Sequence, residues 1–258
     1  MEIISKESKN GDMAKKFFFE VHKDLPREGP GSSKSTQRAY NLVDELPQSA
    51  RVLDIGCGPG AQTRELAELA GEKVIALDYY ASFLYQLKRF SKRSGDESKF
   101  HLVNGDMFHL CFASESFDLI WSEGAIYIIG FEEGLREWRR LLKPDGYLAV
   151  TECTWLKDNA PSELSDFWGE AYPAMGDLAS NLESARQAGY RVLGYIVLPS
   201  SDWWEYYHPI EARLRELSDK YQDNPAALQA FEEEEKEIEI FKKYSSYYSY
   251  VFYVLQIE

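Results

Sequence analysis

Three glycines and an acidic residue lie close together in the segment VLDIGCGPGAQT, residues 52–63. Gly56, Gly58 and Gly60 allow the backbone to turn tightly and to approach a ligand without an intervening Cβ. The helix predicted after them offers free N–H groups at its N-terminus to a polar or anionic group. The pattern predicts a ligand site built on the main chain. GCGPGA alone also fits the loose GxGxxA fingerprint of dinucleotide-binding folds, and an ordinary tight turn is the simplest alternative.

Three carboxylates indicate which ligand suits this glycine loop. Asp78 ends the second apolar run, where its carboxylate can accept both hydroxyls of a ribose. Asp106 follows the third apolar run and can accept a hydrogen bond from an adenine amino group. Asp54 lies two residues before Gly56, where it would repel a pyrophosphate and attract an ammonium group. S-adenosylmethionine therefore fits better than NAD, and a nicotinamide-dependent oxidoreductase is the weaker alternative.

These motifs lie within a regular alternation of apolar runs and amphipathic segments between residues 51 and 150. Strands are predicted over the apolar runs, at 52–55, 74–77, 100–103, 117–121 and 147–150. Helices are predicted between them, at 61–70, 81–93 and 131–142. Short buried strands that alternate with helices indicate βαβ units and a mostly parallel sheet. KPDG at 143–146 has the composition of a turn.

The flanking segments follow a different pattern. An apolar cluster at 17–21 predicts a short helix, and a glycine-rich loop at 25–33 separates it from a second helix capped by Ser35 or Thr36. Beyond residue 151, helices are expected near 178–188 and within an insertion at 200–245. Strands are expected at 190–199 and in the aromatic C-terminal segment. The acidic run at 232–235 is most simply a solvated helix face.

The charge balance disfavours polyanionic partners. The 258 residues include 29 Lys and Arg against 43 Asp and Glu, a formal net charge of -14, whereas a nucleic-acid surface normally has a basic excess. Three scattered cysteines and four histidines without ligand spacing argue against a disulfide framework or a metal site. Neither a signal segment nor a membrane-spanning apolar run is evident. We expect a cytoplasmic monomer or homodimer with neither nucleic-acid nor membrane partners.

The ordered motifs of one superfamily are matched by five segments: VLDIGCGPG, the acidic Asp78, GDM at 105–107, DLIWSEGAIY at 118–127 and LLKPDGYLAV at 141–150. Residues 50–155 resemble the class I S-adenosylmethionine-dependent methyltransferases. Within that superfamily they resemble the small-molecule group that includes ubiquinone and menaquinone biosynthesis enzymes. The resemblance implies a Rossmann-like α/β fold with helices on both faces of a seven-stranded, mostly parallel sheet. Its last strand would be antiparallel, and the C-terminal segment is the natural candidate.

The resemblance also implies roles for single residues. The cofactor contacts would follow the first four strands: Asp54, Gly56, Cys57 and Gly58 at the methionine end, Asp78 at the ribose, Tyr79, Asp106 and Met107 around the adenine, and Ser122 near the methyl group. Cys57 would contribute a backbone contact at most. Residues 50–155 would thus be the cofactor-binding core of a single methyltransferase domain spanning 1–258.

A small-molecule methyl acceptor is expected. WSEGAIY after the fourth strand lacks both the Asn/Asp-Pro-Pro-aromatic turn of nucleobase amino-methyltransferases and the cysteine of cytosine C5 chemistry. Alignment supplies much of the acceleration, because the cofactor already activates the carbon; a base helps where the acceptor must lose a proton. The predicted catalytic residues are Glu123 and His208, with Glu152 and Tyr127 as further candidates for a base. Structural roles for Glu123 and His208, and a protein that binds the cofactor without catalysis, are the alternatives.

Three segments are expected to cover the carboxyl ends of the strands, where ligands bind in open α/β sheets. They are a lid at 1–34, with Gly29 and Gly31 as possible hinges, the stretch after the fifth strand, and the helical and aromatic insertion at 200–245 over the acceptor site. The predicted acceptor contacts are Tyr127, Trp155 and Trp204. Such aromatic walls can attract a cationic or planar acceptor, although aromatic side chains also commonly fill a core.

Overall fold

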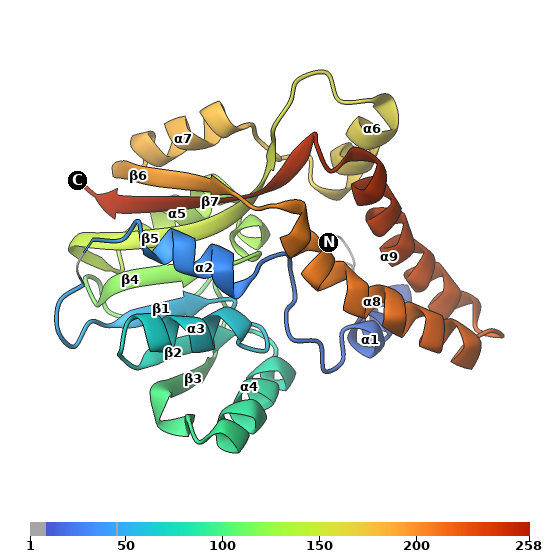
Figure 1. Cartoon of the computed structure of the whole chain (residues 1–258), viewed down its shortest axis with the longest axis horizontal. Coiled ribbons are helices and arrows are strands. Elements are labelled where there is room, and N and C mark those ends of the chain that lie inside the picture. Colours follow the sequence, from blue (N-terminus) through green and yellow to red (C-terminus); the bar gives the residue numbers. More distant parts are fainter. Residues whose placement is uncertain (1–8, 45) are drawn as a thin grey trace.

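The computed structural model describes residues 9–44 and 46–258, and a seven-stranded sheet lies at its centre (Figure 1). The strands are β1 (Val52–Ile55), β2 (Val74–Asp78), β3 (Phe100–Asn104), β4 (Phe117–Ser122), β5 (Leu142–Trp155), β6 (Tyr190–Val197) and β7 (Tyr248–Ile257). Their order is β3-β2-β1-β4-β5-β7-β6. The first five strands pair in parallel, whereas β7 runs antiparallel to β5 and β6. The predicted Rossmann-like sheet is confirmed.

Helices cover both faces of the sheet. They are α1 (Lys9–Val21), α2 (Ser33–Tyr40), α3 (Ala61–Leu69), α4 (Ala81–Ser94), α5 (Phe131–Arg139), α6 (Ser162–Ala171), α7 (Leu178–Gln187), α8 (Ser200–Lys220) and α9 (Pro225–Tyr244), with short 3-10 helices η2 (Glu97–Lys99) and η3 (Ile126–Ile128). Within the described residues, no helix is sufficiently long and apolar to span a membrane.

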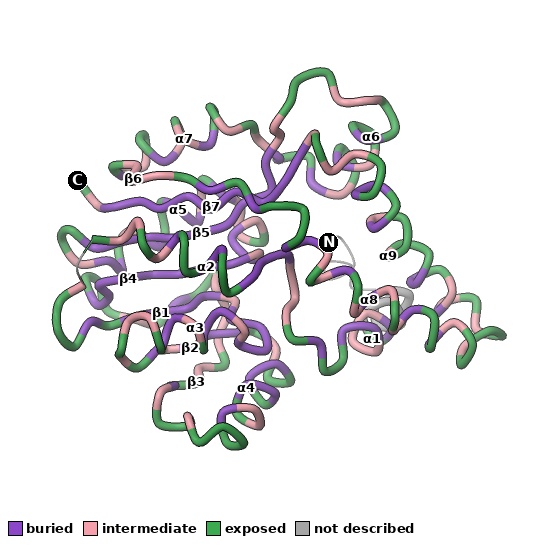
Figure 2. The backbone as a smooth tube through the Cα atoms, viewed as in Figure 1, coloured by how far each residue is buried: buried purple, intermediate pink, exposed green. Residues whose placement is uncertain are grey.

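A hydrophobic core lies on each face of the sheet, because side chains along the buried strands point alternately to the two faces. Val52 of β1 packs with apolar residues of α2 and α3, whereas its neighbour Leu53 packs with residues of α5 and α7 on the other face. Successive side chains of a strand point to opposite faces, so each strand contributes to both cores. Figure 2 shows the central strands buried and the outer faces of α8 and α9 exposed.

Two local predictions were wrong. KPDG, predicted to be a turn before the fifth strand, lies inside β5 instead. There Asp145 has a φ of 61°, and the pairing of β5 with β4 shifts register. Helix α2 is capped by Ser32, whose hydroxyl accepts the Ser35 N–H, because Ser32 has extended backbone angles. Ser35 and Thr36, the predicted caps, lie within the helix and their hydroxyls bond elsewhere.

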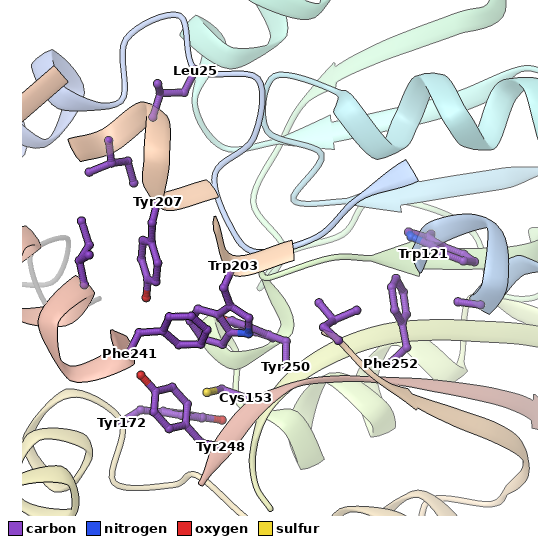
Figure 3. Close-up of a cluster of buried hydrophobic side chains, with 14 of the residues drawn as sticks. Leu25, Trp121, Cys153, Tyr172, Trp203, Tyr207, Phe241, Tyr248, Tyr250 and Phe252 are labelled. Atoms are coloured by element: carbon purple, nitrogen blue, oxygen red, sulfur yellow. The ribbon is translucent and has the colours of Figure 1, made fainter. Parts of the chain in front are cut away.

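The insertion predicted at 200–245 consists of α8 and α9, which pack with α1 beside the sheet (Figure 1). Aromatic side chains join these helices to the core. Trp203 stacks on Phe241 with ring centroids 4.6 Å apart, and Tyr248 of β7 meets both rings (Figure 3). Trp203 and Tyr207 are therefore core residues. Figure 3 also shows Cys153 and Tyr172 at the end of this cluster nearest Tyr248.

Candidate functional site

The glycine loop connects β1 to α3 in a conformation that depends on glycine. Gly56, Gly58 and Gly60 all have positive φ values, of 71°, 54° and 88°. A Cβ added to Gly56 would lie 2.5 Å from the Cβ of Ala125, in the loop after β4. The loop therefore packs directly against the segment that follows β4, as a close approach of two strand ends requires.

Replacing Gly56 with alanine is expected to lower the free energy of unfolding by about 2–4 kcal/mol, since it adds left-handed backbone strain to an overpacked contact. Gly71 is the matched control, because its φ is 65° and nothing lies within 4 Å of its Cβ position. Gly71→Ala should cost only the backbone term, about 1 kcal/mol. Urea denaturation of both variants measures the difference, and equal losses would contradict the packing argument.

Asp78 ties the glycine loop to the end of β2. Its Oδ2 accepts the Gly58 N–H at 2.8 Å, and its Oδ1 accepts the Tyr80 N–H at 2.8 Å. Burial raises the pKa of Asp78, and the two backbone hydrogen bonds oppose this change. Each carboxylate oxygen keeps a further acceptor site, so Asp78 can shape the loop and still accept ligand hydroxyls.

Asp54 is fully buried beneath the glycine loop. Its Oδ2 accepts the hydroxyl of Thr63 at 2.7 Å, but its Oδ1 has no hydrogen-bond partner. Burial raises the pKa of Asp54 to about 7. An unpartnered buried carboxylate oxygen is costly, and an ammonium group is the partner that would best relieve it. The site thus fits the amino-acid end of S-adenosylmethionine.

The three residues predicted to surround the adenine differ in their contacts within the protein. Asp106 accepts the Phe108 N–H at 2.9 Å and lies 3.1 Å from a ring nitrogen of His109; the first of these bonds is the main cause of its lowered pKa. Tyr79 is 63% exposed, so its ring is available to a ligand. Met107 lies near the Cβ position of Gly56. The predicted adenine contacts therefore surround the same loop.

Sequence reasoning missed Asn104, which closes this side of the site. Its side-chain amide donates to the carbonyls of Asp78 and Tyr79, at 3.0 and 2.8 Å. These bonds fix the end of β3 against the end of β2. An asparagine directly before the GDM motif was the available signal.

Three further predicted residues are occupied by internal hydrogen bonds. Ser122 is buried and donates to the Ile55 carbonyl at 2.8 Å, so it joins β4 to β1. Glu123 accepts from Thr36 and Trp121 through Oε1 and pairs with Arg27 through Oε2 at 3.0 Å. Cys57 is buried and its thiol donates to the Gly58 carbonyl. For Glu123 these contacts favour the structural alternative over a base.

The segment between α1 and α2, residues 22–32, crosses the ends of β1 and β4. Gly29 faces Gly124, and the Cβ position of Gly58 is 3.4 Å from the Glu28 side chain. His22 anchors this α1–α2 segment, with Nδ1 2.7 Å from Glu28 and Nε2 3.4 Å from Glu234 of α9. Burial alone would lower the pKa of His22, but the bonds to both glutamates raise it to about 10.

This arrangement corrects the interpretation of the acidic run at 232–235 as wholly solvated. Glu232, Glu233 and Glu235 are exposed, whereas Glu234 turns inward to the buried His22. Of the lid predicted at 1–34, residues 1–8 lie outside the described part of the chain. The basic and acidic residues beside the glycines at 27–31 were the signal for these contacts.

The predicted acceptor residues separate into two groups. Tyr127 of η3 contacts Tyr172 edge to face, with centroids 5.9 Å apart, and Trp155 meets Tyr248 at the end of β5. Trp204 stacks on His208 at 4.9 Å and contacts Phe241 and Lys242 of α9. His208 is exposed. Tyr127 and Trp155 therefore belong to the strand ends, whereas Trp204 and His208 belong to the α8–α9 surface, which favours the packing alternative for His208.

Comparison with known proteins agrees with this geometry. A family model described as a methyltransferase domain matches residues 53–150. The sterol 24-C-methyltransferase ERG6B of Gibberella zeae is 29% identical over 190 residues, which cover 69% of this chain and 49% of that protein. The malonyl-[acyl-carrier protein] O-methyltransferase of Enterobacter lignolyticus is 37% identical over 153 residues, covering 58% and 53%. The chain thus spans about half the length of these relatives.

A solved structure extends the likeness to nearly the whole fold. The S-adenosylmethionine-dependent methyltransferase of Geobacter sulfurreducens, in complex with S-adenosylhomocysteine, superposes with a TM-score of 0.80 at 18% identity. The match covers 94% of this chain and 98% of that one. Residues 53–150 therefore match a methyltransferase domain, and the chain has the fold of the solved S-adenosylmethionine-dependent methyltransferase.

Proposed function

We propose that this protein transfers a methyl group from S-adenosylmethionine to a small-molecule acceptor. The observation that carries the proposal is the buried Asp54 Oδ1, which has no hydrogen-bond partner beneath the glycine loop. The curated relatives are named for transfer to a sterol carbon and to an oxygen of malonyl-[acyl-carrier protein]. They support methyl transfer, and they differ in the acceptor.

The chain's own residues bind and orient the reactants. The cofactor, when bound, supplies a methyl group on a positively charged sulfur, and the acceptor attacks the carbon of that methyl group in line with the carbon–sulfur bond. Asp54 would pair with the amino group of the cofactor and Asp78 would accept its ribose hydroxyls, while Tyr79 and Met107 flank the adenine. The α1–α2 segment would serve as part of a lid that excludes water, because it already lies across the ends of β1 and β4.

A nicotinamide-dependent oxidoreductase is the weaker alternative on the same residues. Its pyrophosphate would lie against the glycine loop, close to the buried Asp54. Because like charges repel strongly where water is excluded, the site opposes that ligand. The cytoplasmic location, the lack of nucleic-acid and membrane partners and the monomeric or homodimeric state stay predictions.

Binding of S-adenosylhomocysteine tests the cofactor. Asp78→Ala should weaken binding tenfold to more than a hundredfold, about 1.5–3 kcal/mol, because it removes hydrogen bonds to a charged group and releases the glycine loop. Glu72→Ala, in the turn before β2 and so at the opposite ends of the parallel strands, should leave the affinity unchanged. Calorimetry measures both variants. Tight binding of NAD with no response to S-adenosylhomocysteine would contradict the proposal.

Activity is tested with S-adenosylmethionine labelled in its methyl group. The full chain, incubated with a metabolite extract, should transfer label to a small molecule that mass spectrometry can identify. A protein that binds the cofactor tightly and labels nothing would be the non-catalytic alternative instead.

A further inference from the structure

A second buried carboxylate lies near the site without a partner. Glu152 lies in β5, two residues beyond Val150, whose register partner in β4 is Ser122. Its side chain is 1% exposed, and neither carboxylate oxygen has a hydrogen-bond partner. Other buried acids among the described residues leave at most one carboxylate oxygen without a hydrogen bond, as Asp54 does, whereas Glu152 leaves both. No ion pair among the described residues includes Glu152. Such a group requires a ligand, a bound proton or both.

Glu152 directly follows, in β5, a residue that contacts the segments around the proposed site. The hydroxyl of its neighbour Thr151 accepts the Gly124 N–H at 2.7 Å. Gly124 contacts Gly29 of the α1–α2 segment, and the next residue, Ala125, packs against Gly56 of the glycine loop. A chain of direct contacts therefore runs from β5 beside Glu152 to the loop that would hold the cofactor.

The surroundings of Glu152 are largely aromatic and contain no cation among the described residues, and a second acid, Glu237 of α9, acts on three of the same groups, Tyr127, Cys153 and Tyr250. The Tyr172 hydroxyl is near enough to oppose the rise in the pKa of Glu152, but the two groups lack the geometry of a hydrogen bond, and that hydroxyl has no other partner. Tyr172 in turn contacts Tyr127 edge to face. The titratable groups that feel the charge of Glu152 are Tyr127, Cys153, Tyr172, Tyr250 and Tyr253. All of them are neutral near pH 7, so none compensates it.

These features select among chemical classes of acceptor. Once Glu152 is ionised, it would repel a carboxylate or phosphate placed here, since no cation of the described chain lies nearby to compensate it. An alcohol would donate one hydrogen bond and leave the charge in place. An ammonium group supplies both the opposite charge and several N–H donors, and the faces of Tyr127 and Tyr172 add cation–π attraction. The amine is the class that satisfies every group.

We propose that Glu152, together with Tyr127 and Tyr172, binds the amino group of the acceptor, so that the substrate is a small amine that enters as an ammonium ion. The proposal rests on the methyl-transfer function above and names its substrate class. It makes Glu152, rather than Glu123 or His208, the titratable residue that touches the acceptor.

The step balances with Glu152 as the base. The bound ammonium gives one proton to the Glu152 carboxylate, which leaves an amine with a free lone pair. That lone pair forms the nitrogen–carbon bond to the methyl group, while the carbon–sulfur bond breaks and its electron pair goes to sulfur. The products are the methylated ammonium ion, S-adenosylhomocysteine and protonated Glu152, which then loses its proton to solvent.

The protonation behaviour of Glu152 suits this role. Burial raises its pKa to about 8, and the Tyr172 hydroxyl opposes the rise. An aliphatic amine such as lysine has a pKa of about 10.4. Burial therefore makes Glu152 a stronger base than an exposed glutamate, which is the direction that proton transfer from an ammonium requires.

The chemical class of the labelled product gives the first test. Label from methyl-labelled S-adenosylmethionine and a metabolite extract should appear in small molecules retained by a cation exchanger, with the new methyl group on nitrogen. Label on a carbon, oxygen or sulfur atom would overturn the amine proposal and leave methyl transfer intact. A protein that labels nothing would contradict methyl transfer, and the amine proposal with it.

Variants of the full chain give the second test, with the amine isolated above. Glu152→Gln should lower kcat/KM at least a hundredfold and leave the affinity for S-adenosylhomocysteine within about twofold. Glu152→Asp, which keeps the charge, should retain part of the activity. Glu163→Gln is the matched control, because it removes an acid at the surface of α6 that pairs with Lys243.

A binding measurement separates acceptor recognition from catalysis. In the presence of S-adenosylhomocysteine, the isolated amine should raise the Tm of the native protein and of Glu163→Gln, but not that of Glu152→Gln. Amine binding or turnover that is equal in Glu152→Gln and the native protein would overturn the assignment.

Discussion

Glu152→Gln is expected to be more stable than the native protein at pH 8 by up to about 4 kcal/mol, and nearly equal to it at pH 5. The physical reason is burial, which raises the pKa of Glu152 from 4.5 to about 8 in the folded protein. Each pKa unit corresponds to about 1.36 kcal/mol, so this is among the largest effects of any single substitution here. Glutamine keeps the shape and removes the charge.

The direction of the effect follows from proton linkage. Between pH 4.5 and about 8 the folded protein holds a proton on Glu152 that the unfolded chain has lost. The folded state binds more protons in this window, so stability is fully present below pH 4.5 and falls as the pH rises towards 8. Asp54, whose pKa burial raises to about 7, produces a similar trend in both proteins and cancels in their difference.

Urea denaturation at pH 5, 6.5 and 8 measures this difference. The gap between Glu152→Gln and the native protein should widen steadily across the series, whereas Glu163→Gln, which changes an exposed acid, should follow the native curve. Parallel curves for Glu152→Gln and the native protein would show that Glu152 is charged and compensated in the folded state. A buried acid that destabilises the free protein is the kind of compromise that binding sites carry.

Arg27→Met is expected to release the α1–α2 segment from the end of β4. Arg27 and Glu123 form an ion pair with side chains only 10% and 3% exposed. Removing one partner of a buried pair leaves an uncompensated charge, at a cost of about 3–5 kcal/mol. Since Thr36 and Trp121 still hold Glu123 in place, the cost should appear mainly as opening of the segment.

Hydrogen exchange of the peptide that covers residues 22–32 measures this opening. Exchange should accelerate by more than a hundredfold in Arg27→Met, and S-adenosylhomocysteine should slow it again if the segment lies over the cofactor. Arg89→Met is the matched control, because Arg89 pairs with Asp24 of the same segment, but both side chains are about 40% exposed. Exposed pairs contribute 0–1 kcal/mol, so little change is expected there. Equal acceleration in both variants would contradict the role assigned to the buried pair.

The local pattern of the chain was enough to place the glycine loop and its two nearby carboxylates at the ends of strands. Gly56 and Gly58 require glycine because of their own backbone angles, and Asp54 and Asp78 follow apolar runs that form strands for reasons of hydrophobic burial. Adjacent residues and short hydrophobic periods carry this information, so the strands and the parallel core could be predicted, whereas the order of the strands in the sheet was not predicted. The antiparallel C-terminal strand followed from the family resemblance.

The partners of the acidic residues could not be predicted in the same way. Glu123 seemed the better base from its place beside β4, yet Arg27, Thr36 and Trp121 occupy both of its oxygens. Two of these partners are about 90 residues away along the chain, on the α1–α2 segment and α2. Trp204 contacts α9 and stacks on the exposed His208, whereas the buried face of α8 carries Trp203 and Tyr207.

From the sequence Glu152 was one of four candidates for a base, behind Glu123 and His208. Its properties arise from β7 on one side and from Tyr127 and Tyr172 on the other, which exclude water without supplying a hydrogen bond. Sequence patterns determine where a carboxylate lies along a strand, because alternation and burial are local. Whether that carboxylate is neutralised, paired or free to bind a ligand depends on which distant side chains surround it, and only packing in three dimensions fixes those neighbours.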